Sequence, residues 1–309
     1  MDSVLGEGPL SPLASPSATR EVLDAFGLST KKQLGQNFLV NDAILKKIVS
    51  LAELCPKDFV LEVGPGVGTL TIALLKTAGR VLSVEADSDL PAVLAHTTKP
   101  WAKRFALLNK DALTLDDGDF DEVDAVGRPN KFVANLPYAV AATLILDYFQ
   151  RFPNIESATV MVQKEVADRI AGKPGSKNYG AYTVKLGLYA KVSGRIIVGP
   201  QNFFPPPHVD SAVIRLDRTP VIDGDGYVLT SCEIKDACTM ADAAFANRRK
   251  TLGNSFKTYF SSRGKDLAFS PDKIVRLFEE ADIDPRRRGE TLDQAEFIRL
   301  ARAYRQLCE

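Results

Sequence analysis

Short apolar runs alternate with stretches of helical periodicity through the first two thirds of this 309-residue chain. A connection of about ten or more residues leaves room for a helix, and helical crossovers of this kind join parallel strands. The pattern therefore predicts an α/β fold with a mostly parallel sheet. The expected strands are Phe59–Val63, Arg80–Glu85, Phe105–Lys110, Lys131–Asn135, Ala158–Gln163, Lys185–Val192 and Ser211–Leu216.

The pattern changes after Asp217, where a turn-rich stretch, T-P-V-I-D-G-D-G-Y, precedes a series of amphipathic segments. We expect an α/β domain over residues 20–218 and a small all-helical C-terminal domain over 219–309. Residues 1–19 are rich in Ser, Pro, Ala and Gly without periodicity, and are expected to be a disordered leader. The expected helices are Arg20–Phe26 and Asp42–Leu54 before the first strand, and Glu233–Phe245, Lys250–Ser261, Pro271–Ala281 and Leu292–Leu307 in the C-terminal domain.

Composition narrows the class of protein further. No run approaches the roughly 18 apolar residues of a membrane-spanning helix, and the N-terminus lacks a basic start followed by an apolar segment. The four cysteines show no C-x-x-C spacing, so neither a disulfide framework nor a metal site is expected. We expect a cytoplasmic protein that binds neither a membrane nor a metal ion.

The formal net charge is zero, but the charges are unevenly distributed along the chain. Residues 81–130 contain ten acids and five bases, whereas residues 151–220 contain ten bases and five acids. Because phosphate binding depends on local Lys and Arg, the average does not exclude a nucleic-acid partner.

A glycine-rich loop, L-E-V-G-P-G-V-G-T-L, follows the first expected strand. Gly64 and Gly66 let the backbone turn tightly and let a ligand lie against it, at the edge where open α/β sheets bind ligands. The spacing differs from the G-x-G-x-x-G fingerprint of dinucleotide sites. Glu85 ends the next strand, where its carboxylate can accept hydrogen bonds from ribose hydroxyls. Asp111 follows the third strand as an acceptor for an adenine amino group, so the set suits S-adenosylmethionine better than NAD.

The fourth strand ends in Asn135-Leu136-Pro137-Tyr138. An exocyclic adenine amine is a poor nucleophile because its lone pair is delocalised into the ring. The Asn135 side-chain carbonyl and the backbone carbonyl of Leu136 or Pro137 could accept its two N–H groups and hold the nitrogen in line with a sulfonium methyl group. Tyr138 offers a ring on which the base can stack.

These stretches resemble one family, the ribosomal RNA adenine N6,N6-dimethyltransferases of the bacterial small-subunit type. The resemblance extends from about Thr30 to Ala301. The matching stretches are L-G-Q-N-F-L (34–39), L-E-V-G-P-G-V-G-T-L (61–70), V-E-A-D (84–87), K-D-A-L (110–113), N-L-P-Y (135–138), M-V-Q-K-E-V-A-D-R-I (161–170), F-F-P-P-P-H-V-D-S-A-V (203–213) and A-F-A-N-R-R-K-T-L (244–252).

The resemblance implies a Rossmann-like methyltransferase fold, S-adenosylmethionine as cofactor, and roles for particular residues. The cofactor contacts it implies are Asn37, Leu39, Gly64, Glu85, Asp111 and Asn135. It places the flipped adenine between Tyr138 and Phe203, with Phe204 as the alternative second ring. The phosphate contacts it implies are Lys164, Arg169, Lys173, Lys177, Arg248, Arg249 and Lys250. His208 stands where the family usually has lysine.

The activity that the resemblance implies is N6,N6-dimethylation of two adjacent adenosines in the hairpin loop near the 3′ end of 16S rRNA. The implied partner is this RNA within the small ribosomal subunit, engaged with the help of the C-terminal domain by a monomeric enzyme. Three other interpretations remain open. They are an NAD-dependent oxidoreductase, a non-catalytic rRNA-binding assembly factor, and a large-subunit rRNA adenine methyltransferase of the antibiotic-resistance type.

Overall fold

The computed structural model describes residues 8–31, 35–123, 127–261 and 269–308. The chain divides into two compact units, Met1–Ala167 with Val192–Arg218, and Asp168–Lys191 with Thr219–Glu309. Residues 168–191 therefore group with the C-terminal helices, whereas the sequence placed a single boundary after residue 218.

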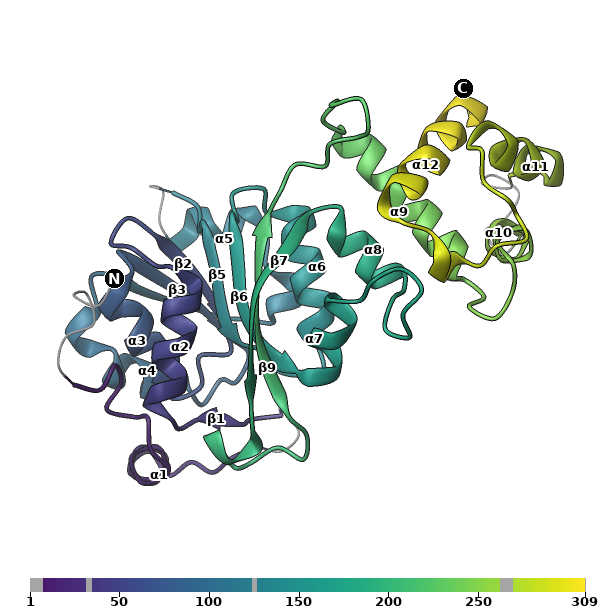
Figure 1. Cartoon of the computed structure of the whole chain (residues 1–309). Coiled ribbons are helices and arrows are strands. Elements are labelled where there is room, and N and C mark those ends of the chain that lie inside the picture. The colour runs from purple at the N-terminus through teal and green to yellow at the C-terminus, as the bar shows by residue number, and fades with distance from the viewer. Residues whose placement is uncertain (1–7, 32–34, 124–126, 262–268, 309) are drawn as a thin grey trace. The chain divides into compact units, whose positions relative to one another are not determined.

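The first unit is built on a seven-stranded sheet with the strand order β4-β3-β2-β5-β6-β9-β7 (Figure 1). All pairs from β4 to β6 are parallel, and β9 pairs antiparallel with β6. The strand order changes direction between β2 and β5, and open sheets of this kind bind ligands in the crevice at such a point. The strands are β2 Phe59–Val63, β3 Arg80–Glu85, β4 Phe105–Asn109, β5 Lys131–Asn135, β6 Ser157–Gln163, β7 Ala190–Val198 and β9 Ser211–Arg218.

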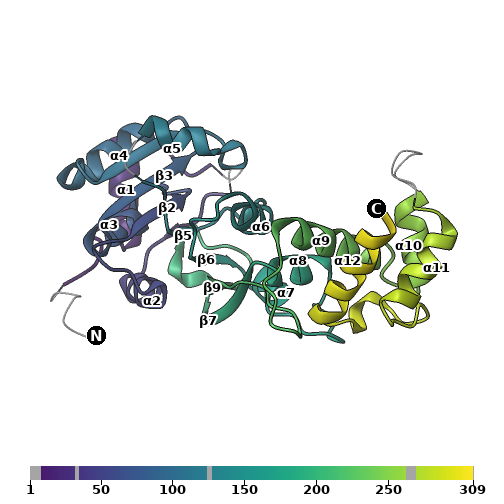
Figure 2. The ribbon, with the colours of Figure 1, turned by 90° about the horizontal axis from the view of Figure 1, so that it is seen from above.

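Helices cover both faces of this sheet, as Figure 2 shows from above. Val133 packs in one hydrophobic cluster with residues of α2 and α3, while the ring of its neighbour Phe132 lies 5.0 Å from that of Tyr148 on α6. Because successive side chains of a strand point to opposite faces, these helices lie on opposite sides. Beyond residue 41, the helices of this unit are α2 Asp42–Ala52, α3 Thr69–Thr77, α4 Pro91–Thr97, α5 Asp117–Val123 and α6 Ala141–Arg151, with α7 Lys164–Ile170 continuing into the second unit.

The expectation of a disordered leader is wrong for residues 8–19. Leu10 and Leu13 are buried, and the amides of Leu10 and Ser11 donate to Asp42 Oδ1 at 2.7 and 3.2 Å. Helix α1 begins at Pro16, capped by Ser15, and ends at Ala25. Two leucines spaced three apart gave too weak a periodic signal for a helix or strand, but tertiary contacts order them. Residues 1–7 lie outside the described part of the chain.

A small two-stranded sheet lies beside the main one. β1 (Phe38–Leu39) pairs antiparallel with β8 (Phe203–Phe204), so Leu39 lies opposite Phe203. This pairing joins the matching stretch L-G-Q-N-F-L (34–39) to the proline-rich stretch before β9.

The second unit is helical, as expected, and is formed by α8 Ala181–Gly187, α9 Ser231–Phe245, α10 Leu252–Ser261, α11 Pro271–Glu280 and α12 Gln294–Cys308. The expected strand Lys185–Val192 is wrong, because this run contains the end of α8 and the start of β7. Val184 and Leu188 are four residues apart and both pack into the hydrophobic cluster of this unit. Apolar residues four apart can share a face of either a helix or a strand, and burial among the helices of this unit decides for the helix. Among the helices of the described residues, none is long and apolar enough to cross a membrane.

Truncation of Leu10 tests whether residues 8–19 contribute to the stability of the core. The change Leu10→Ala should lower the free energy of unfolding by about 2 kcal/mol, because it removes a buried side chain. The measurement is urea unfolding. Leu113→Ala is the matched control, since Leu113 is 40% exposed and its truncation should cost less than about 0.5 kcal/mol. Equal effects of the two changes would show that the segment does not stabilise the fold.

Candidate active site

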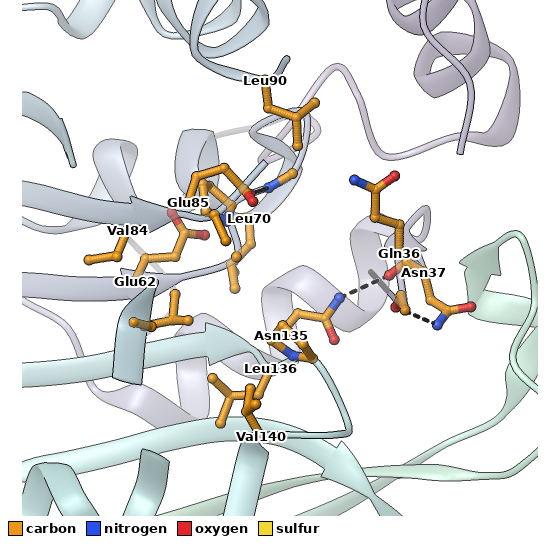
Figure 3. A pocket seen from close by; sticks show the side chains of 18 of the residues that line it. Gln36, Asn37, Glu62, Leu70, Val84, Glu85, Leu90, Asn135, Leu136 and Val140 are labelled. Carbon is orange, nitrogen blue, oxygen red and sulfur yellow. Dashed lines mark hydrogen bonds between the residues drawn. The ribbon is translucent and has the colours of Figure 1, made fainter. Parts of the chain in front are cut away.

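A cavity of about 620 Å³ lies in the first unit, where β2, β3 and β5 end. It is lined by ten of the residues singled out from the sequence, which come from five separate stretches. They are Asn37, Leu39, Gly64, Gly66, Glu85, Asp111, Asn135, Leu136, Pro137 and Tyr138. Figure 3 shows Glu62 and Glu85 at one side of this cavity and Gln36 and Asn37 at the other, with Asn135 between them.

The glycine loop has the backbone conformation that its sequence requires. Gly64 and Gly66 have φ of +67° and +59°, a region in which residues with a side chain are strained. A Cβ at Gly66 would also lie 2.7 Å from Cε1 of Phe38. Glycine is therefore needed at this position both for the turn and for the close contact with Phe38.

Glu85 is fixed at the end of β3 by two backbone amides. Gly66 N donates to Oε2 at 3.3 Å, and Asp87 N donates to Oε1 at 2.9 Å. Burial raises the pKa of Glu85, and these hydrogen bonds oppose that rise. The carboxylate is held at the cavity wall in the place where a ribose acceptor was expected.

Glu62, which sequence reasoning missed, is a second buried acid at the cavity. Its Oε2 accepts from Thr71 Oγ1 and Ser83 Oγ, both at 2.7 Å. Burial raises its pKa to about 7, although the two hydroxyl groups act in the opposite direction. A charged residue within the apolar run Phe59–Val63 was the available signal, because a buried acid requires partners.

The charge at the cavity suits a cationic ligand. Among the described residues, the wall contains the carboxyl groups of Glu62, Glu85 and Asp111 and one lysine, Lys110, which is paired with Asp119 at 2.6 Å. A sulfonium group would be attracted to this wall, whereas a pyrophosphate would be repelled. The residues present therefore fit S-adenosylmethionine, and they fit the doubly charged pyrophosphate of NAD poorly.

The end of β5 and the turn after it bring Asn135, Leu136 and Pro137 to the wall of the cavity. Asn135 Nδ2 donates to the backbone carbonyl of Asn37 at 3.0 Å. Pro137 O already accepts from Val140 N and Ala141 N at 3.2 and 3.1 Å. No amide of the described chain donates to Leu136 O. Of the two backbone carbonyls left open by the sequence, that of Leu136 is therefore the one with a free acceptor.

Tyr138 lines the cavity, and its hydroxyl group lies 2.6 Å from Oγ of Ser211 at the start of β9. Ser211 is a second residue that the sequence did not single out. Burial raises the pKa of Tyr138, so its phenol is neutral at physiological pH.

Phe203 does not line the cavity, contrary to its expected place opposite Tyr138. Its side chain is 3% exposed and packs in a core cluster with Leu39 and Val213, because β8 pairs with β1. Phe204 is half-buried, and the guanidinium of Arg20 lies 5.0 Å from the centre of its ring. The structure thus supplies one aromatic ring of the expected pair at the cavity.

Most of the expected phosphate contacts belong to the second unit. Arg248 Nη2 donates to Lys177 O at 2.5 Å, and Arg248 Nε donates to Glu290 at 3.3 Å. This brings the loop 172–180 beside the start of α10, with Lys173, Arg249 and Lys250 exposed. Their contact with RNA stays a prediction, as does that of Arg169 in the same unit and of Lys164 at the start of α7. His208 is exposed.

Comparison with known proteins identifies the family of the chain. The family model described as ribosomal RNA adenine dimethylase matches residues 27–299. Proteins named ribosomal RNA small subunit methyltransferase A are similar over nearly the whole chain. That of Corynebacterium diphtheriae is 39% identical, covering 94% of this chain and 95% of its own. That of Bifidobacterium adolescentis is 40% identical, covering 92% and 91%.

Solved structures show the same fold. A dimethyladenosine transferase from Plasmodium falciparum has a TM-score of 0.71 at 24% identity, covering 88% of this chain and 98% of its own. The 23S rRNA methyltransferase ErmE has a TM-score of 0.61 at 24% identity, covering 86% and 99%. The fold and the cavity are those of a Rossmann-like methyltransferase that uses S-adenosylmethionine. The chain belongs to the ribosomal RNA adenine dimethylase family.

The described residues contain no group of three or more His, Cys, Asp or Glu side chains that could hold a metal ion.

Replacement of Glu62 tests its buried state through the pH dependence of stability. Its folded pKa of about 7 exceeds the ordinary value of 4.5, so the folded protein binds this proton more tightly than the unfolded chain. The contribution to the free energy of unfolding therefore falls as pH rises from 4.5 to 7, by up to about 3 kcal/mol. Glu62→Gln should flatten this slope in urea titrations at several pH values. An unchanged slope would contradict the raised pKa.

Proposed function

We propose that this protein transfers methyl groups from S-adenosylmethionine to the N6 atoms of two adjacent adenosines in the 3′-terminal hairpin loop of 16S rRNA, forming N6,N6-dimethyladenosine at each. The observation that carries the proposal is one cavity that joins the glycine loop, Glu85 and Asp111 to Asn135 and Tyr138. The first three suit an adenosyl group, and the last two suit a target base.

Bound S-adenosylmethionine supplies an electrophilic methyl group on a sulfonium. The chain's own contribution is to bind and orient the acceptor. Asn135 Oδ1 and Leu136 O accept the two N–H groups of the adenine, which holds the lone pair of N6 in line with the methyl group. Each transfer would break the S–CH3 bond, release S-adenosylhomocysteine and leave a cationic N6, which is acidic enough to give one proton to water. Because positioning of the amine and attraction of the sulfonium provide the catalysis, no side chain of the cavity has to act as a strong base.

Tyr138 positions the base from its side. The ring is neutral and is held through its hydroxyl group at Ser211, so its face is available for stacking. Aromatic rings stack on unpaired bases in many RNA-binding sites. A base that has left its stack therefore finds both a ring and two acceptors in the same cavity.

The small ribosomal subunit is the proposed substrate because the relatives at 36–40% identity carry the name small subunit methyltransferase. The likeness to the 23S rRNA methyltransferase is one of fold. We further propose that the protein acts in the cytoplasm as a monomer, as expected from the sequence, and that exposed bases of the second unit contact RNA phosphates.

Methylation by the purified protein tests the proposed substrate and the role of Asn135 together. With labelled S-adenosylmethionine, the purified protein should methylate small subunits isolated from a strain that lacks this modification. Asn135→Ala should reduce the rate at least about a hundredfold because the amine loses an acceptor and its alignment. Binding of S-adenosylhomocysteine, followed by calorimetry, should stay measurable. Label found only in large-subunit RNA would refute the proposed substrate, and an unchanged rate would remove the role of Asn135.

Replacement of Tyr138 tests whether its ring stacks on the target base. Tyr138→Ala should weaken base positioning by roughly 1–3 kcal/mol, the scale of base–aromatic stacking, seen as a lower kcat/KM for the subunit. Tyr138→Phe is the matched control, because it keeps the ring and loses only the hydrogen bond to Ser211. The phenylalanine variant should keep most of the activity that the alanine variant loses. Equal activity of the alanine variant and the wild type would exclude the stack.

A further inference from the structure

Residues 36–38 each contact the end of a different strand. Gln36 Nε2 donates to Asp87 Oδ2, just after β3, at 2.8 Å. The Asn37 carbonyl accepts from Asn135 at the end of β5 at 3.0 Å. Phe38 packs on Gly66 after β2, so closely that a Cβ there would lie 2.7 Å from its ring. Residues 36–38 thus form one wall of the cavity (Figure 3).

The contact between Asn37 and Asn135 fixes which way the carboxamide of Asn135 points. A backbone carbonyl can only accept a hydrogen bond, so the atom of Asn135 that faces it must be the NH2 group. The side-chain oxygen then lies on the other branch of the amide, and it has no hydrogen bond to any described residue. In this orientation Asn135 offers an acceptor, whereas the flipped amide would offer a donor and repel the N–H groups of an amine.

Asp87 anchors this arrangement. Its side chain is 3% exposed, and it accepts from Lys31 Nζ at 2.6 Å as well as from Gln36. The backbone amide of Lys31 donates to Gln36 Oε1 at 2.8 Å, so Gln36 is held at both ends of its amide. The pKa of Asp87 is lowered, since burial acts to raise it but the hydrogen bonds from Lys31, Asp89 and Gln36 outweigh that effect. An ionised, buried carboxylate therefore holds the residue next to Asn37.

We propose that Asp87 and Gln36 are positioning residues for methyl transfer. By holding Gln36, Asp87 fixes the carbonyl of Asn37, which keeps Asn135 in the orientation that accepts the adenine amine. The role of Asn135 as that acceptor rests on the proposed function. The orientation of its amide does not, and it can be measured separately.

The variant Gln36→Leu tests this proposal, because it keeps the size of the side chain and removes both hydrogen bonds. Asp89→Asn is the matched control, since Asp89 also pairs with Lys31, at 2.6 Å, whereas the side-chain hydrogen bonds of Gln36 go to Lys31 N and Asp87. The measurements for each variant are kcat and KM on unmodified small subunits, the Kd for S-adenosylhomocysteine, the melting temperature, and the NMR signals of the Asn135 side-chain amide. These signals are assigned from their loss in Asn135→Asp.

Gln36→Leu should move the Asn135 amide proton that bonds to Asn37 upfield and speed its exchange with water. Its kcat should fall roughly tenfold to a hundredfold, as for a small misplacement of a reacting group, while Kd and melting temperature change little. Asp89→Asn should keep kcat within about twofold of the wild type, the spread expected for an exposed charge. Conversion of Asp87 to Asn, which leaves one acceptor for Gln36, should retain more activity than Asp87→Leu.

An Asn135 amide signal that Gln36→Leu leaves in place would overturn the proposed anchoring. A displaced signal with an unchanged kcat would overturn the positioning role. If the wild type transfers no label to small subunits, the substrate assignment fails, but the NMR comparison still decides whether Gln36 and Asp87 orient Asn135.

Discussion

The contact of residues 36–38 with the three strand ends is the constraint on which the site depends. Strands β2, β3 and β5 supply a glycine turn, an acidic acceptor and an asparagine, but a sheet edge alone is an open surface. Residues 36–38 turn this edge into a cavity, because Phe38 packs against Gly66, where no side chain is tolerated. The same segment orients Asn135 through a backbone carbonyl. A part of the chain distant in sequence thus determines the chemistry available at β5.

Electrostatics and hydrogen bonding divide the cavity into two regions with different tasks. The carboxyl groups of Glu85 and Asp111 on the cofactor side favour a sulfonium over a phosphate, and Glu62, whose pKa is raised to about 7, adds only part of a negative charge near neutral pH. The side formed by Asn135, Leu136 and Tyr138 is neutral and offers acceptors and a ring. An amine needs alignment more than proton removal, so a neutral second region is sufficient. Family membership and this division support the same reaction.

Much of the fold could be predicted from periodicity, and the exceptions have physical causes. The bounds of β2, β3 and β5 agree with the expected ones, because fully buried parallel strands are continuous apolar runs between turn residues. The α/β class and the helical C-terminal region are confirmed. The run Lys185–Val192 was misassigned because its apolar spacing fits either element, and burial of Val184 and Leu188 in the helical cluster decides between them. Residues 8–19 are ordered by a distant acid, Asp42, which local composition cannot reveal.

The sequence by itself determined which residues could form a methyl-transfer site: the glycines with their required backbone, the acids that end two strands, and the N-L-P-Y turn. These are local properties, set by backbone sterics and by the position of a residue at the end of a strand. Only the tertiary structure decided how they are used. Pairing of β8 with β1 keeps Phe203 out of the cavity, and the turn after β5 leaves the carbonyl of Leu136, rather than that of Pro137, free to accept. The structure also revealed Glu62, Ser211 and the link from Asp87 to Asn135. Hydrogen-bond partners far apart in the chain are chosen by packing, and a linear pattern does not record that choice.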